Sequence, residues 1–207
     1  MRAVLSYFLP LGRELDEDEQ RRHRLMVAFL LVTASYAISY IPVSIAIEYN
    51  VALAAIALTG VLCMSLCLAL RYGLPIVWVA NIYLSSLTLS TTFLWASTGG
   101  LTITPNDPAF MAFVPAIALL LVGKRWALFW LGTTLLFIAG SGVPGIRGVE
   151  LAVGMNVDWV PTFLVISILG HSVLLYIFVS LFETSRDRAQ RNLEEANEAL
   201  AIEQQKT

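Results

Sequence analysis

The sequence predicts an all-α, polytopic membrane protein with six transmembrane helices. Of its 207 residues, 57% are hydrophobic and only 14% are charged, and the mean hydropathy is +0.74. Soluble domains are about 45–50% apolar and about 25% charged, so this chain is too apolar for water. The segment 25–182 carries only eight of the 28 charged residues. This distribution excludes a soluble enzyme, a disordered tail and a nucleic-acid-binding protein.

The limits of the six spans follow from the charges and the Pro/Gly clusters that interrupt the apolar runs. A helix needs about 20 apolar residues to cross about 30 Å of hydrocarbon. The predicted transmembrane domain, 25–182, holds spans at 25–47, 50–70, 74–96, 109–123, 126–143 and 159–182. The fourth is short, and we expect it to begin inside the preceding loop or to lie tilted.

Basic residues predict the orientation of the bundle. Twelve of the 13 Lys and Arg residues precede the first span, follow the last, or lie in the second–third and fourth–fifth connections; only Arg147 lies on the other side. By the positive-inside rule both termini are cytoplasmic. We expect residues 1–24 to form an interfacial and helical lead-in, because Asp18 and Arg22 are four residues apart with the acid first.

The segment 183–207 contains charged residues, Ala, Leu and Gln, and no Gly or Pro, which is helix composition. Its apolar residues predict a weak cytoplasmic coiled coil of about three heptads. The predicted seam consists of Phe182, Arg186, Ala189, Leu193, Ala196 and Leu200. We expect this signalling helix to continue into an output domain, and the alternative is an ordinary exposed C-terminal helix.

No catalytic motif is present: the chain lacks HExxH, GxSxG and GxxxxGK[ST]. We therefore expect this chain not to be an enzyme and to hold no cofactor or metal. His171 lies near the middle of the sixth span, where an ionisable group indicates a function. The alternative is a neutral histidine hydrogen-bonded to a neighbouring helix. Cys63 and Cys67, one turn apart, are interpreted as small buried hydrophobic residues rather than a Cu(I) site.

Hydroxyl side chains in the first, third and sixth spans predict either close helix packing or a small-molecule cavity. Two glycines and two prolines between Thr98 and Pro108 predict a defined external turn, with a lid as the functional alternative. The candidate ligand-binding residues are Asn81, Tyr83, Trp95, Thr98, Gly99, Gly100, Pro105 and His171.

Short motifs then suggest a family. Thr98-Gly99-Gly100, Pro105, Pro115 and the run Gly123 to Trp126 resemble the TGG…SP…P…GxR pattern of six-helix membrane input domains in bacterial sensor proteins, with Thr104-Pro105 in place of Ser-Pro. Such domains precede class III nucleotide cyclases, histidine kinases or diguanylate cyclases. The segment 193–207 resembles their signalling helix, and its ending is most similar to the segment before class III cyclase domains. The resemblance covers about half of the chain.

The resemblance implies a homodimeric receptor in the bacterial inner membrane. It would respond to a membrane lipid or small hydrophobic ligand, and the seam of the last helix would relay the signal. The output implied is a catalytic domain of the same polypeptide, an adenylyl or guanylyl cyclase in preference to a histidine kinase. No nucleic-acid partner is expected. Two alternatives remain, a small membrane transporter or channel and a purely structural anchor.

Overall fold

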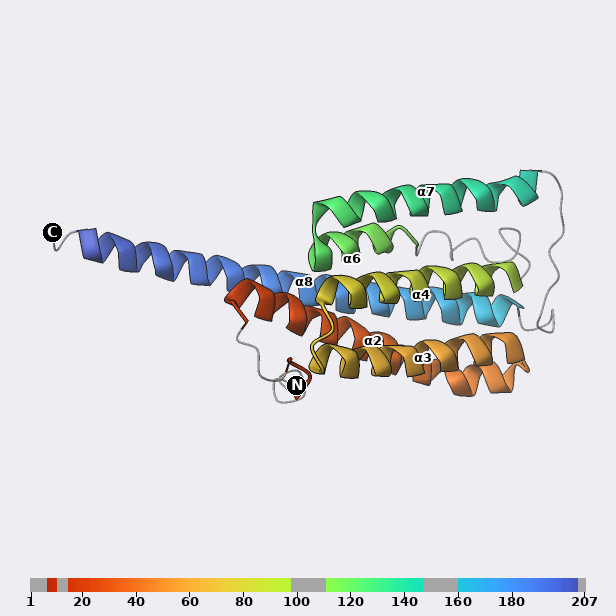
Figure 1. Cartoon of the computed structure of the whole chain (residues 1–207). Coiled ribbons are helices and arrows are strands. Elements are labelled where there is room, and N and C mark those ends of the chain that lie inside the picture. Colours follow the sequence, from red (N-terminus) through yellow and green to blue (C-terminus); the bar gives the residue numbers. More distant parts are fainter. Residues whose placement is uncertain (1–6, 11–14, 98–110, 147–159, 205–207) are drawn as a thin grey trace.

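The computed structural model describes residues 7–10, 15–97, 111–146 and 160–204 (Figure 1). Over these residues the structure is helical and contains no strand. Its helices are α2 (Glu17–Ala46), α3 (Asn50–Arg71), α4 (Ile76–Ser97), α6 (Phe113–Val122), α7 (Lys124–Ile146) and α8 (Val160–Gln204). The all-α fold class is therefore confirmed for the described residues.

Four stretches of the described residues are long and apolar enough to cross a membrane. They are α2, α3, α4 and the Val165–Thr184 part of α8, and they correspond to the predicted spans 25–47, 50–70, 74–96 and 159–182. Within the predicted span 109–123 the described helix, α6, has ten residues, about 15 Å, which is half of the hydrocarbon thickness. The predicted span 126–143 lies within α7. Spans four and five stay predictions.

The first helix begins where the sequence supplies a cap. The Asp16 carboxylate accepts a hydrogen bond from the Glu19 backbone N–H at 2.7 Å, which satisfies one of the donors left open in the first turn. Arg21 and Arg22 both pair with Asp18, at 2.5 and 2.8 Å. Part of the predicted lead-in is thus the first turns of α2, which continue without a break into the first span.

The described piece of the N-terminal segment lies against the α3–α4 turn. The Arg71 guanidinium stacks over the Tyr7 ring at 3.7 Å and donates a hydrogen bond to the Tyr7 carbonyl. Phe8 is buried in the main apolar core. The interfacial position predicted for the first residues is not tested by these contacts.

Successive helices run in opposite directions. The start of α2, the α3–α4 turn and the α6–α7 turn therefore lie at the end of the bundle from which α8 projects (Figure 1). Gly123 makes the α6–α7 turn possible, because its φ of +89° lies in a region that residues with a Cβ rarely adopt. The basic pair that follows it, Lys124 and Arg125, is exposed at this same end.

The core is centred on α2, which packs along α3 and also contacts α4, α6 and α8. Met26, Phe29 and Leu30 are fully buried there. The Phe29 ring meets Phe178 of α8 edge to face, with centroids 4.6 Å apart. By contrast, α7 packs mainly on α6 at the edge of the bundle.

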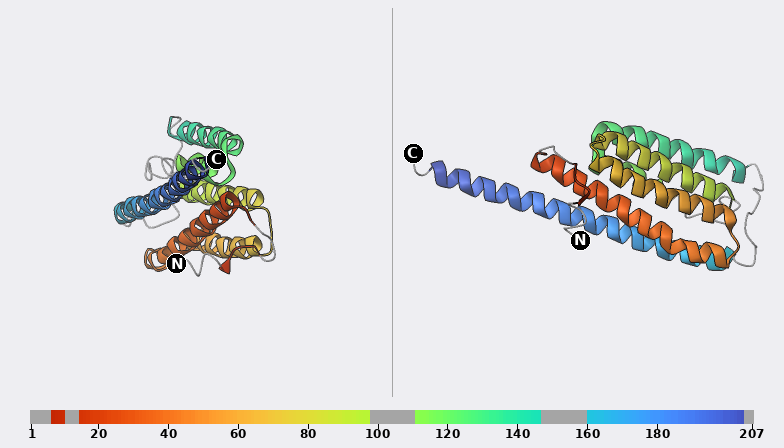
Figure 2. Two further views of the ribbon diagram at one scale, coloured as in Figure 1. Left: turned by 90° about the vertical axis from the view of Figure 1, so that its left-hand side faces the viewer. Right: turned by 60° about the horizontal axis from the view of Figure 1, so that its bottom comes forward.

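The last helix is a single element of 45 residues, about 67 Å long, more than twice the thickness of the hydrocarbon. It packs beside α2 and then extends well past the other helices (Figures 1 and 2). The helix predicted after Phe182 is therefore confirmed as far as Gln204. Phe182 and Arg186 of the predicted seam are exposed. The side chains of Ala189, Leu193, Ala196 and Leu200 lie outside the described residues, and their pairing stays a prediction.

Candidate ligand-binding site

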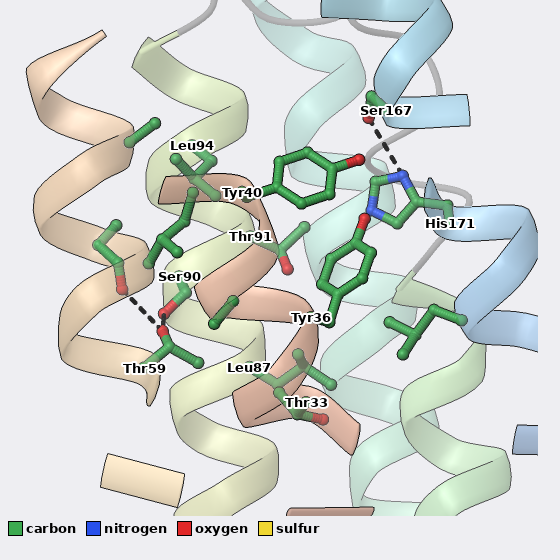
Figure 3. Close-up of a pocket in the computed structure, with 15 residues that line it drawn as sticks. Thr33, Tyr36, Tyr40, Thr59, Leu87, Ser90, Thr91, Leu94, Ser167 and His171 are labelled. Atoms are coloured by element: carbon green, nitrogen blue, oxygen red, sulfur yellow. Dashed lines mark hydrogen bonds between the residues drawn. The ribbon is translucent and has the colours of Figure 1, made fainter. Parts of the chain in front are cut away.

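A cavity of about 110 Å³ lies between α2, α3, α4 and α8 (Figure 3). A single water needs only about 10–15 Å³, so the cavity is large enough for a small molecule. The surface of the wall is mostly apolar, and seven of its lining residues are Ala, Leu or Ile. Its polar lining residues are Thr33, Tyr36, Tyr40, Thr59, Ser90, Thr91, Ser167 and His171. No described residue of the wall carries a carboxylate, ammonium or guanidinium group.

Two tyrosines of α2 form the side of the cavity that faces α8. Tyr40 donates its hydroxyl proton to the Ile166 carbonyl at 2.8 Å, and the Tyr36 and Tyr40 rings lie 4.7 Å apart. A Cβ built on Gly170 would lie 2.1 Å from the Tyr40 Oη and 2.7 Å from the Tyr36 Oη. Only glycine allows α8 to approach α2 this closely, because the two tyrosine hydroxyls occupy the space that a side chain at position 170 would fill.

His171 follows Gly170, and its imidazole lines the cavity beside the two tyrosines. Its Nδ1 lies 3.1 Å from the Ser167 Oγ, one turn earlier on α8, and its ring centroid is 6.4 Å from that of Tyr36. In Figure 3 the Tyr36 hydroxyl is directed toward the imidazole. The structure therefore places His171 in the cavity wall, at the contact between α8 and α2.

The opposite side of the cavity is a hydroxyl pair that links α3 to α4. Thr59 donates its proton to the Ala55 carbonyl at 2.8 Å, and its Oγ1 lies 2.9 Å from the Ser90 Oγ. Because a threonine hydroxyl has one proton, Ser90 must be the donor in the second bond. Ser90, one of the third-span hydroxyls, thus joins two helices and also lines the cavity.

Three predicted ligand candidates lie outside the cavity wall and have structural partners. Tyr83 is fully buried and shares a hydrogen bond of 2.8 Å with Thr33, which itself lines the cavity. Asn81 accepts a hydrogen bond from the Trp130 Nε1 at 2.9 Å and so ties α4 to α7. The Trp95 ring packs edge to face on Phe137 of α7, at 5.9 Å.

The candidates Thr98, Gly99, Gly100 and Pro105 lie outside the described residues. Cys63 and Cys67 are both buried and unbridged. In the part of the chain that the structure describes, no three His, Cys, Asp or Glu side chains are grouped as a metal site requires.

The list of ligand candidates omitted Tyr36 and Tyr40, although the hydroxyls of the first span were predicted either to pack helices or to line a cavity. The prediction missed Thr59 and the role of Gly170. One signal was present: Thr33, Tyr36 and Tyr40 are spaced three and four apart, so they share one face of α2. The chain matches no family model, and comparisons with curated proteins and with solved structures give no significant match.

Proposed function

We propose that this chain is a membrane sensor and dimerisation module. It relays the binding of a small hydrophobic molecule or a membrane lipid through α8 to a cytoplasmic output domain, a nucleotide cyclase in preference to a kinase. One observation carries the proposal. The helix that contributes Ser167, His171 and Leu174 to the cavity wall continues without interruption to Gln204.

The placement of the charges supports an orientation with both termini in the cytoplasm. The described basic residues at the start of α2, Arg71 at the end of α3 and the Lys124–Arg125 pair all belong to the end of the bundle from which α8 projects. Under the positive-inside rule this end faces the cytoplasm. We propose six spans in a bacterial inner membrane, with α7 as the fifth and with α6 and the residues before it as the fourth.

The relay requires that the ligand distinguish two arrangements of α8. A ligand that binds both arrangements with equal affinity does not shift the equilibrium between them. Each tenfold difference in affinity shifts this equilibrium by about 1.4 kcal/mol. The cavity supports such a preference, because its walls come from both α2 and α8 and a shift of α8 would change its shape. In the proposed homodimer, movement of α8 against α2 changes how the two cytoplasmic helices pair along the predicted seam.

The test uses the full chain with a class III cyclase domain fused after Thr207 and measures cAMP in membranes. A two-residue Ala-Ala insertion after Thr184 rotates the distal helix by about 200°, whereas a seven-residue insertion nearly preserves its phase. We expect the two-residue insertion to change cyclase activity several-fold and the seven-residue insertion to leave it nearly unchanged. Equal activity in both insertion variants, or in a fusion to an unrelated dimerising anchor, would favour a structural anchor.

A transporter or channel is the competing function. Proton-coupled transporters usually carry paired ionisable residues at membrane depth. Within the described spans, charged side chains occur only at the helix ends, as with Arg71, and none lines the cavity. Solute flux into liposomes that contain the purified chain would contradict the sensor proposal.

A further inference from the structure

The size of the cavity and its lack of charge define the class of molecule that it can hold. A charged ligand would lose its hydration without gaining an opposite charge, because no described wall residue carries a carboxylate, ammonium or guanidinium. A cavity of about 150 Å³ is known to hold benzene. The cavity here is smaller, at 110 Å³, but it is partly open, so it suits an uncharged molecule no larger than about five or six non-hydrogen atoms.

Thr91 supplies a polar group that points to a ligand. It lines the cavity on α4 and is only 8% exposed. Within the described part of the chain its hydroxyl makes no hydrogen bond. Because Thr91 lines the cavity and its hydroxyl has no partner among the described residues, a ligand that bonds to this hydroxyl gains the worth of one hydrogen bond. In Figure 3 Thr91 lies between the Thr59–Ser90 pair and Tyr36.

The neighbouring hydroxyl pair adds a preference for a ligand that donates a hydrogen bond. The Thr59 proton is used on the Ala55 carbonyl, and the Ser90 proton on Thr59. Each of these two oxygen atoms therefore has only lone pairs left to offer to a ligand. Thr91 can donate or accept, but Thr59 and Ser90 can only accept from a further group.

We propose that this cavity binds a small, uncharged alcohol, whose hydroxyl bonds to Thr91 and donates toward Ser90 while its carbon body contacts the apolar wall. This inference deepens the proposed function and rests on it only in treating the cavity as the sensory site. A ketone of the same size binds more weakly, because it has no proton for the oxygen atoms of Thr59 and Ser90. A lipid acyl chain lacks any group for Thr91.

The test measures the apparent unfolding temperature of the full chain in micelles against increasing cyclopentanol. Thr91→Val keeps the side-chain shape and removes the hydroxyl. Thr88→Val is its matched control, because the Thr88 Oγ1 has no hydrogen-bond partner in the described residues, is buried, and does not line the cavity. Any effect of the alcohol on the micelle itself is common to all three proteins.

We expect a saturable rise in unfolding temperature for the wild type and for Thr88→Val. For Thr91→Val the half-maximal concentration rises about three- to tenfold, the worth of one hydrogen bond. Cyclopentanone requires a similarly higher concentration with the wild type. Equal concentration dependence in all three proteins, or no saturable rise, overturns the inference.

The two proposals fail separately. Saturable cyclopentanol binding that leaves the fused cyclase unchanged contradicts the sensor function and keeps the binding site. Phase-dependent cyclase activity in the α8 insertions without cyclopentanol binding keeps the sensor function and contradicts the ligand class.

Discussion

Replacing Gly170 by alanine tests the contact between α2 and α8 most directly. The new Cβ would lie 2.1 Å from the Tyr40 Oη, whereas ordinary contact begins near 3.4 Å. The Tyr40 hydroxyl must therefore move by about 1 Å or more and give up its 2.8 Å bond to the Ile166 carbonyl. Overpacking costs about 1–3 kcal/mol and the lost bond about 0.5–1.5, while alanine regains about 1 through helix propensity. The expected net loss is about 0.5–3.5 kcal/mol.

The assay is the free energy of unfolding of the full chain in mixed micelles, followed by circular dichroism. Gly132→Ala on α7 is the matched control, because a Cβ there meets no atom within 4 Å. It should leave the free energy unchanged or raise it by up to about 1 kcal/mol. Adding Tyr40→Phe to Gly170→Ala removes the closest colliding atom and should recover part of the loss. Equal effects of the two alanine variants, or no recovery in the double variant, would refute the proposed close approach of α2 and α8.

Two further predictions concern α4 and α3. Asn81→Leu leaves the buried Trp130 N–H without its acceptor, so it should lower the free energy of unfolding by about 1–3 kcal/mol in the same circular-dichroism assay. An unchanged free energy would show that this hydrogen bond does not hold α7 to α4. Cys67 is fully buried, so mass spectrometry should find it alkylated by a maleimide only after the protein is unfolded in SDS. Rapid alkylation of folded protein would contradict the packing of α3 against the core.

The helix limits could be predicted because charges and breakers bracket the apolar runs. The predicted span 50–70 agrees with α3 to within one residue, since it lies between the turn after Ala46 and Arg71. The predicted span 109–123 is described only in part: α6 covers Phe113–Val122, and the first two residues of the predicted span lie outside the described residues. An apolar run alone does not say where a helix starts, because every residue of the run is compatible with hydrocarbon.

The composition of the cavity wall was harder to predict, because lipid and protein interior are equally apolar. A soluble helix shows its buried face by amphipathicity, but a membrane helix gives little such signal. His171 was found because an ionisable side chain at membrane depth is unusual. Asn81 and Trp95 are ligand candidates in the third span, yet they lie on faces of α4 that meet α7. Which face of α4 lines the cavity depends on how this helix is rotated about its own axis, and the sequence does not reveal that rotation.

The way α8 is held makes it the helix best suited to carry a signal. Among its described side chains only Ser167, Leu174 and Phe178 are buried, and they form one narrow stripe. In a membrane, apolar surface adds no driving force between helices. The contact with α2 therefore depends on the Tyr40–Ile166 bond, worth about 0.6–1.7 kcal/mol, and on the packing of Phe29 with Phe178, worth about 0.5–1.5.

These contacts together are worth about 1–3 kcal/mol, which is the range of typical coupling free energies between two sites. A ligand that prefers one position of α8 by ten- to a hundredfold supplies about 1.4–2.7 kcal/mol, enough to offset them. A more extensive α2–α8 interface, like that between α2 and α3, would resist any ligand of this size. Few contacts between α8 and α2 are thus a condition for relaying a signal. Variants that add contacts between these two helices should hold the activity of the output domain at one level, whether or not the ligand is present.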